Sequence, residues 1–189
     1  MKLYHIDRSG HIKSGETISL IKNFPTKKMK DKEYYKDGLS SHGLCYYTYD
    51  ARDNNFLIDV VFEYERLLHY PDKLSRYQAF FCFDGYGVIE FVKTKYLEDN
   101  FYKIYEIDVD PKKVERHNMS LVRGWSHQSA LKYARLYFED KPNIYDKDDK
   151  IIYEYLVKLP VVIGKEIKLS QIEKIVKQKE KSNKKINSK

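Results

Sequence analysis

The chain has 189 residues, a formal net charge of +7, a hydrophobic fraction of 42% and a mean hydropathy of −0.69. This length suffices for one domain with its own core, and we expect neither a membrane span nor a signal peptide. Cys45 and Cys82 lack the spacing of a metal site or a disulfide framework, so we expect buried thiols in a cytoplasmic protein.

The positive charge is concentrated near the C-terminus. Residues 170–189 contain seven lysines and two glutamates, which leaves a net charge of +2 for the preceding 169 residues. We expect a single domain over residues 1–169, followed by a lysine-rich tail over residues 170–189 that is helical or disordered. A second basic cluster, over residues 27–36, also contains two tyrosines and fits either a solvated loop or a nucleic-acid site. Its candidate contacts are Lys27, Lys28, Lys30 and Lys32.

The hydrophobic pattern predicts strands and helices that alternate along the chain without regular βαβ spacing. Strands or extended segments are expected over residues 2–6, 11–21, 43–49, 76–83, 102–109, 118–122, 151–159 and 161–169. Helices are expected over residues 51–70, 87–97 and 126–140, the last capped by Ser126. This order predicts an α+β fold in which a mostly antiparallel, split sheet is flanked by helices.

The strand around Glu154 has two largely apolar faces. Ile152 and Leu156 share the face of Glu154, because side chains alternate along a strand. Burying an unpaired carboxylate costs on the order of several kcal/mol. Glu154 is therefore either an edge-strand residue paired with a lysine across the sheet or an active-site carboxylate.

A group of hydrogen-bonding side chains stands at the entrance of the buried strand that is expected over residues 76–83. An arginine beside a hydroxyl suits a phosphate or diphosphate, because a guanidinium binds two oxygens at once. An arginine tied to a loop carbonyl would explain the same pattern. The group consists of Ser75, Arg76, Tyr77 and Gln78.

Other motifs with a defined chemistry are absent from the sequence. There is no P-loop, no Gly-rich dinucleotide fingerprint and no HExxH, and the six histidines lack metal spacing, so we expect no metal site. Glu166 and Lys168 have the Glu-x-Lys spacing of some metal nucleases, which a lysine-rich chain also produces by chance.

Four segments together resemble the ADP-ribosyltransferase fold, and most closely its His-Tyr-Glu branch with its uncharacterised bacterial and phage members. They are LYHIDR, SRYQAFFCFDGYGVIEFV, YKIYEIDVD and IYEYL, and the resemblance spans roughly residues 2–168. It implies an enzyme that uses NAD as a substrate and needs no metal. Such enzymes split the bond between nicotinamide and ribose through an oxocarbenium-like sugar, and transfer ADP-ribose to a macromolecular acceptor, here a nucleic acid or a protein.

The resemblance also implies roles for individual residues. His5 would hydrogen-bond a ribose hydroxyl, and Glu154 would hold the 2′-hydroxyl of the nicotinamide ribose and stabilise positive charge, so both would face one NAD-sized hollow. An aromatic ring would stack on nicotinamide; where the family usually has tyrosine, this chain offers Phe80 or Phe81, with Tyr77 nearby. The implied catalytic residues are Glu154 and His5, and the implied NAD contacts are Tyr4, His5, Arg8, Ser75, Arg76, Tyr77 and Phe81.

Two other functions fit parts of the sequence. A non-catalytic nucleic-acid-binding module would use the cluster at residues 27–36 and the C-terminal tail. A metal nuclease would use Glu166 and Lys168. Small free-standing transferases of the fold often act as toxins or effectors, and by that analogy a neutralising partner protein is expected.

Overall fold

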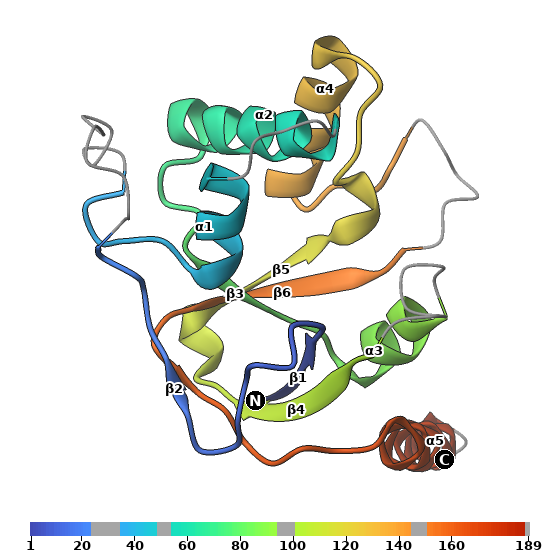
Figure 1. The fold of residues 1–189 in the computed structure, drawn as a ribbon. Coiled ribbons are helices and arrows are strands. Elements are labelled where there is room, and N and C mark those ends of the chain that lie inside the picture. The colour runs from blue at the N-terminus through green and yellow to red at the C-terminus, as the bar shows by residue number, and fades with distance from the viewer. Residues whose placement is uncertain (24–34, 49–53, 94–100, 145–150, 188–189) are drawn as a thin grey trace.

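The computed structural model describes residues 1–23, 35–48, 54–93, 101–144 and 151–187 (Figure 1). The helices of this part are α1 (Ser41–Thr48), α2 (Asn54–His69), α3 (Gly85–Val92), α4 (His127–Phe138) and α5 (Leu169–Asn187). The strands are β1 (Lys2–Asp7), β2 (Thr17–Ile18), β3 (Ala79–Cys82), β4 (Lys103–Asp108), β5 (Val114–Asn118), β6 (Tyr153–Lys158) and β7 (Val161–Val162). The fold is α+β, as predicted. In this part of the chain, no helix is both long and apolar enough to cross a membrane.

The sheet is split into small antiparallel pieces. One piece has the strand order β3-β6-β5, a second pairs β1 with β4, and a third pairs β2 with β7. Among the described residues, β1 is joined to the residue that follows β3 by one backbone pair, in which Tyr4 and Phe83 exchange two N–H···O bonds of 2.8 Å. These observations confirm the predicted antiparallel, split sheet.

Helices cover the two larger pieces, β3-β6-β5 and β1–β4, which we call the two half-sheets, on different sides (Figure 1). Helices α1, α2 and α4 lie over the β3-β6-β5 piece, where Phe62 of α2 packs with Tyr137 and Phe138 of α4. Helices α3 and α5 lie beside the β1–β4 pair. Ile172 and Val176 of α5 are buried in the same core cluster as residues of β1 and α3, so the first half of α5 is part of the folded body.

The predicted strand over residues 43–49 is wrong, because the structure places helix α1 there. The Ser40 hydroxyl accepts a hydrogen bond from the Gly43 backbone N–H at 3.0 Å, as an N-cap residue does. A Cβ at Gly43 would lie 1.9 Å from the Tyr77 carbonyl oxygen, so only glycine lets the helix approach that segment. The tight approach depends on a distant part of the chain and is invisible to local periodicity.

Some strand bounds were also wrong. The strand predicted at residues 118–122 ends at Asn118, because its side chain accepts from the Ser120 N–H at 3.0 Å and starts a 3-10 turn over Met119–Leu121. The charged strand β5 before it was not predicted. Only Thr17–Ile18 and Val161–Val162 form strands in the segments 11–21 and 161–169.

The remaining predicted elements are close to the observed ones. Helices α2, α3 and α4 lie close to the expected ranges, and Ser126 caps α4 in a capping box with Ser129. Strands β1, β3, β4 and β6 also fall where they were predicted. The expectation of two buried thiols holds for Cys82 and is wrong for Cys45, which is exposed; both are free.

Helix α2 buries several charged residues beside Ile58 and Phe62, and it turns other apolar residues toward solvent. Its buried charged residues are Asp59, Glu63, Glu65 and Arg66. Its exposed apolar residues are Leu57, Val60, Tyr64, Leu67 and Leu68. Charged residues are rarely buried unless they are paired. We therefore expect ion-pair partners for the buried charged residues of α2.

Candidate functional site

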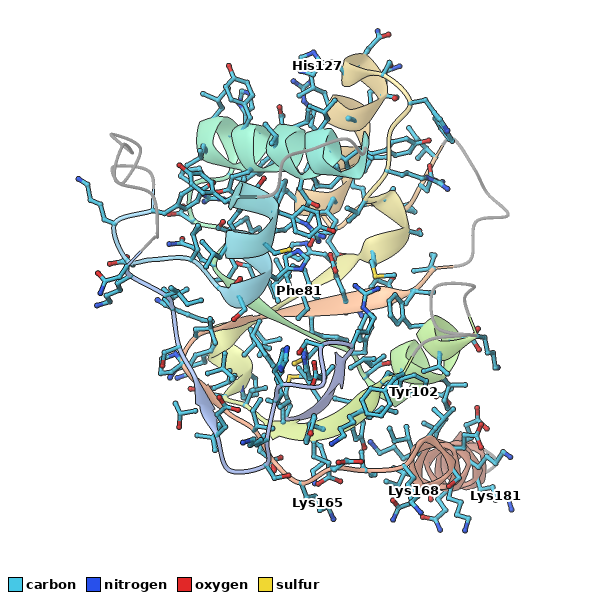
Figure 2. The ribbon with its side chains drawn as sticks, in the orientation of Figure 1. Phe81, Tyr102, His127, Lys165, Lys168 and Lys181 are labelled. Atoms are coloured by element: carbon cyan, nitrogen blue, oxygen red, sulfur yellow. The ribbon has the colours of Figure 1, made fainter. Side chains whose placement is uncertain are left out.

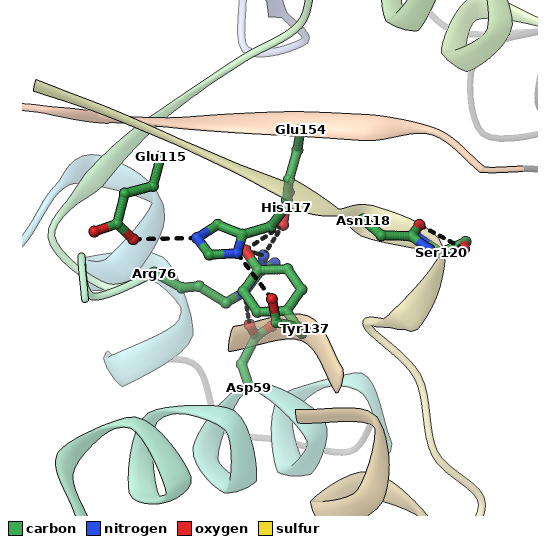
Figure 3. A network of polar contacts seen from close by, with 8 residues as sticks. All are labelled: Asp59, Arg76, Glu115, His117, Asn118, Ser120, Tyr137 and Glu154. Carbon is green, nitrogen blue, oxygen red and sulfur yellow. Dashed lines mark hydrogen bonds and ion pairs between the residues drawn. The ribbon is translucent and has the colours of Figure 1, made fainter. Parts of the chain in front are cut away.

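The side chain of Arg76 enters the interior at the turn that follows α2. In this turn the Ser75 hydroxyl accepts from the Tyr77 N–H at 3.1 Å, and the Ser75 carbonyl accepts from Gln78 at 3.0 Å and Ala79 at 2.9 Å. The turn leads directly into β3. Arg76 is thereby directed between α2 and β6, where it is almost fully buried (Figure 3).

Arg76 bridges two carboxylates and a phenol. Its Nε donates to Asp59 Oδ1 of α2 at 2.8 Å, and its Nη1 forms an ion pair with Glu154 Oε1 of β6. Nη1 also lies 3.1 Å from the hydroxyl of Tyr137 in α4, which itself donates to Glu154 Oε1 at 2.7 Å (Figure 3). One guanidinium therefore joins α2, α4 and β6.

Burial keeps Tyr137 protonated in this network. Burial and the neighbouring Glu154 carboxylate raise the pKa of Tyr137 well above its ordinary value. Tyr137 is therefore a permanent hydrogen-bond donor to Glu154, whose side chain is 2% exposed. The Glu154 carboxylate is satisfied by a cation and a phenol in this structure.

A second buried pair lies against Tyr137. His117 of β5 stacks on the Tyr137 ring, with centroids 4.3 Å apart. Its Nδ1 faces the Tyr137 carbonyl at 3.0 Å and its Nε2 faces Glu115 Oε2 at 3.1 Å, so both ring nitrogens meet acceptors (Figure 3). Although burial opposes it, hydrogen bonds from His117 and Leu74 hold the pKa of Glu115 below its ordinary value. The His117 ring is therefore held between the Tyr137 carbonyl and the Glu115 carboxylate.

Aromatic and imidazole rings and the Arg76 guanidinium gather around Phe81 of β3, at the centre of the molecule (Figure 2). The Arg76 Cζ lies 5.0 Å from the Phe81 ring centroid, and the His42 ring of α1 lies 4.4 Å from it. Tyr46 contacts His42 from the next turn of α1, with centroids 4.5 Å apart. From β1, the His5 Nδ1 donates to the Phe81 carbonyl at 2.7 Å.

Both histidines near Phe81 are neutral at pH 7. Burial lowers the pKa of His5, and burial together with the positive charge of Arg76 lowers the pKa of His42 to about 4. Because a carbonyl oxygen only accepts, the proton of His5 is on Nδ1. The Nε2 of His5 is therefore left as a hydrogen-bond acceptor.

Comparison with known proteins places the chain in a family. Residues 3–177 match the family described as "Protein of unknown function (DUF2441)". The chain belongs to the DUF2441 family. A search of curated proteins finds no match. The match includes Arg76, Glu154 and the other residues of the buried network, so the DUF2441 family covers nearly all of the described fold.

The structure brings together some residues that the sequence singled out in this DUF2441 chain. Arg76, Phe81 and Glu154 meet as described above. The partner of Glu154 is Arg76, and not the lysine that the structural explanation expected. Arg76 is bound to carboxylates, where a loop carbonyl was the alternative.

The other predicted NAD contacts have separate positions. Tyr4 is buried in a core cluster, and Tyr77 is buried and stacks on Tyr35 with centroids 5.6 Å apart. Ser75 bonds within its own turn, and Arg8 is exposed just after β1. Phe80 stacks on the His5 ring at 4.2 Å.

His5 and Glu154 do not face the same hollow. Tyr155 pairs with Cys82, which packs with Leu3 in one core cluster, so these three share a face. Because side chains alternate along strands, His5 lies on the face of Leu3 and Glu154 lies on the opposite face. The expected common hollow is therefore wrong for this structure, and the low exposure of Glu154 agrees with that.

Two further sets of residues were singled out for other functions. Lys27, Lys28, Lys30 and Lys32 lie outside the described residues. Glu166 is exposed and lies 3.7 Å from Lys103, and Lys168 is also exposed. In the part of the chain that the structure describes, no group of three or more metal-ligating side chains is assembled.

Sequence reasoning missed Asp59, His42, His117 and Tyr137 as partners in the site. The one available signal was in α2, where Asp59, Glu63 and Arg66 recur at helical spacing and form a charged stripe. His117 and Tyr137 carry no local signal, because their role comes from the pairing of β5 with β6 and from the packing of α4 above them.

Proposed function

We propose that this DUF2441 protein is an NAD-dependent ADP-ribosyltransferase. The observation that supports it is the meeting of three distant segments where the sheet splits. Beyond the Tyr4–Phe83 pair, the Phe81 carbonyl accepts from the ring of His5, where a continuous sheet would supply a backbone N–H of β1. Arg76 lies over the ring of the same Phe81 and binds Glu154.

In this proposal, NAD binds where the two half-sheets separate. A ligand at a split can reach groups on both faces of the sheet, which resolves the opposite placement of His5 and Glu154. The Nε2 of His5 accepts a hydrogen bond from a ribose hydroxyl, and the exposed Arg8 contributes positive charge for the diphosphate. The Phe81 ring, flanked by His42, supplies the aromatic surface.

Because Glu154 is paired with Arg76 in this structure, the reaction requires Arg76 to release Glu154 when NAD binds. A diphosphate competes with the carboxylate for the guanidinium, because both are anions with oxygen acceptors for its N–H groups. Glu154 then accepts from the 2′-hydroxyl of the nicotinamide ribose and stabilises positive charge as the glycosidic C–N bond breaks. Nicotinamide leaves with the electron pair of that bond, and a nucleophile of a macromolecular acceptor forms the new bond to the ribose carbon and releases its proton to solvent.

The test is nicotinamide release from NAD by wild type, Glu154→Gln and Asp59→Asn. Asp59→Asn is a matched control, because it removes one carboxylate from Arg76 and leaves Glu154 intact. We expect NAD to raise the Tm of all three proteins, and we expect release by wild type and Asp59→Asn but not by Glu154→Gln.

Two results would reject the proposal. One is a wild-type protein that releases no nicotinamide and whose Tm does not respond to NAD. The other is an equal loss of activity in Glu154→Gln and Asp59→Asn at equal loss of stability, since that pattern describes a structural ion pair and not a catalytic carboxylate.

The surface of α5 favours a second candidate function, nucleic-acid binding without catalysis. Ile172 and Val176 anchor one face of the helix in the core, and lysines project from the exposed face. A basic helix face attracts a phosphate backbone by releasing counterions. The exposed lysines of α5 used for the test are Lys177, Lys179 and Lys181.

This second candidate is tested by the salt dependence of binding to a labelled oligonucleotide. Replacing Lys177, Lys179 and Lys181 with glutamine should make the slope of log K against log salt less negative, by about 0.9 for each duplex phosphate that is no longer neutralised. Glutamine at Lys112, Lys113 and Lys158 removes the same charge from other exposed sites. Equal slopes for the two triple variants would mean that α5 does not bind the phosphates.

A further inference from the structure

An apolar stripe runs along the outward side of α2. Every residue that is exposed between positions 57 and 68 is aliphatic or a tyrosine, and the charged residues of this range are buried. Figure 1 shows α2 on the outer side of the helices that cover the β3-β6-β5 piece. The stripe consists of Leu57, Val60, Tyr64, Leu67 and Leu68, which are 59%, 41%, 56%, 39% and 55% exposed, with Val61 half-buried beside them.

The stripe has a charged rim. Glu65, the buried carboxylate beside it, binds Arg135 of α4 at 2.8 Å and lies 3.9 Å from His69, and both of these partners have exposed side chains. Single apolar residues are ordinary on a protein surface, whereas a contiguous apolar patch rimmed by polar residues is typical of an interaction site. An apolar centre with a polar rim is also the usual composition of a protein–protein interface.

The spacing of the stripe indicates that a helix covers it. Leu57, Val60, Tyr64 and Leu67 follow one another at intervals of three, four and three residues, which is the a/d spacing of helices that pack side by side. Leu68 widens this seam by following its last member. Side chains at this spacing interlock with those of a second helix that has the same seam.

We infer that two copies of this chain associate through α2, with the two helices antiparallel about a twofold axis that crosses them between Val61 and Tyr64. Leu57 then packs on Leu68 of the second copy, and the large Tyr64 ring lies over the small Val61. A parallel pair would set Tyr64 against Tyr64 and Val60 against Val60, which leaves the helices unevenly separated. A twofold contact needs one self-complementary surface, and the absence of exposed charge between positions 57 and 68 removes like-charge repulsion at the axis.

The exposed area of the stripe matches what a small dimer interface needs. At about 200 Å² for a fully exposed large side chain, the five exposed fractions correspond to roughly 500 Å² in each copy. Two copies together bury about 1,000 Å², which is the lower limit for a specific interface. A weak, reversible dimer is therefore expected, with a Kd on the order of 10–100 µM.

The experiment is sedimentation of the full chain from about 1 µM to about 500 µM, a range that spans the expected Kd. We expect the mass to rise from 22.7 kDa toward twice that value. Leu68→Lys should weaken association at least tenfold, because it puts a charge against Leu57 of the second copy. Ile144→Lys is the matched control, because Ile144 is 61% exposed outside the stripe and gains the same charge; its Kd should stay within about twofold of that of wild type.

These variants separate association from folding and from the proposed transferase activity. At about 1 µM the chain is a monomer, so Leu68→Lys should leave its Tm unchanged there. Asp59 is buried on the other side of α2, where it binds Arg76, so the result does not depend on NAD chemistry. A wild-type chain that stays monomeric throughout would overturn the inference and leave the stripe to a different protein. Equal weakening by Leu68→Lys and Ile144→Lys would also overturn it.

Disulfide trapping tests the antiparallel arrangement. Because Cys45 is exposed, the variants are made in a Cys45→Ser background. An equal mixture of Leu57→Cys and Leu68→Cys should form a mixed disulfide dimer under mild oxidation, since these positions face each other across the axis, whereas each variant alone should form little. Efficient trapping within either variant alone, or none in the mixture, would contradict the antiparallel pairing.

Discussion

Among single residues, Arg76 is the one on which the buried charges depend. It is the cation shared by Asp59 and Glu154, both of which are almost fully buried. Removing one member of a buried ion network leaves the others without a partner in a medium of low polarity. The two carboxylates can then become neutral only by binding protons.

We predict that Arg76→Met destabilises the protein by about 3–5 kcal/mol, measured by urea unfolding at pH 7. Neutralising the stranded groups should recover part of this loss, so the triple variant Arg76→Met, Asp59→Asn, Glu154→Gln should be more stable than Arg76→Met alone. A triple variant no more stable than the single one would mean that the network is held by something other than charge pairing.

His42 gives the fold a sensitivity to acid in a defined range. Its pKa is about 4 in the folded protein, against an ordinary value of 6.5. The unfolded chain therefore binds more protons than the folded one between these values, so stability falls as the pH drops from 6.5 to 4 and levels off below that. His5 acts in the same direction, because burial lowers its pKa as well.

We predict that His42→Phe removes a large part of this acid sensitivity. The difference in unfolding free energy between wild type and variant should change by on the order of 1–3 kcal/mol between pH 7 and pH 4. Urea unfolding at several pH values measures it. His127→Phe, at an exposed position of α4, is the control and should leave the pH dependence as it is.

Sequence reasoning found chemically unusual residues and could not find their partners. Glu154 was singled out because an apolar strand gives a carboxylate no inexpensive position, and Arg76 because it stands at the entrance of a buried strand. That these two residues bind each other follows from the pairing of β3 with β6. Strand pairing is a long-range property, and a single sequence carries little information about it.

Among the secondary-structure elements, α2 best shows the limit of periodicity. Its apolar residues and its charged residues both recur at helical spacing, so the pattern predicts the helix correctly and does not say which stripe faces inward. Hydrophobic burial alone would put the apolar stripe inside. The structure buries charged residues together with Ile58 and Phe62, because arginines from outside the helix, Arg76 and Arg135, reach Asp59 and Glu65.

We predict stability effects of very different size for two large side chains of α2. Leu68 is 55% exposed, so Leu68→Gln should change the unfolding free energy by no more than about 0.5 kcal/mol. Phe62 is fully buried against α4, so Phe62→Ala should cost about 3–5 kcal/mol. Denaturant unfolding of the two variants tests which residues of α2 are inside, and similar losses at both positions would contradict this orientation of the helix.

At the scale of the whole molecule, the first half of α5 completes the core cluster beside β1 and α3. Residues 170–189 were expected to form a tail separate from the domain, and the first part of that range supplies Ile172 and Val176 to the cluster around Tyr4 and Phe83. The high lysine content made the segment resemble a solvated extension. Two apolar residues four positions apart are enough to attach a helix to a core, and composition does not reveal them.

We predict that the chain can be shortened to Gln178 but not to Leu169. Ending at Gln178 keeps both buried side chains, so Tm and cooperativity should be nearly unchanged. Ending at Leu169 exposes the cluster on β1 and α3, and should abolish cooperative thermal unfolding or cost several kcal/mol, on the order of two buried aliphatic side chains. Circular dichroism melts of both proteins test this, and equal melts would mean that α5 is dispensable.

The inward charges of α2 have a calorimetric consequence. Exposing apolar surface on unfolding raises the heat capacity, whereas exposing polar surface lowers it. A layer between helix and sheet that contains carboxylates and guanidiniums should therefore give a heat-capacity increment below the usual value of about 12–15 cal/mol/K per residue. Hydration of ions also becomes less favourable on warming, so burying them costs less free energy at high temperature. This layer should therefore contribute more to the unfolding free energy at high temperature than at low temperature.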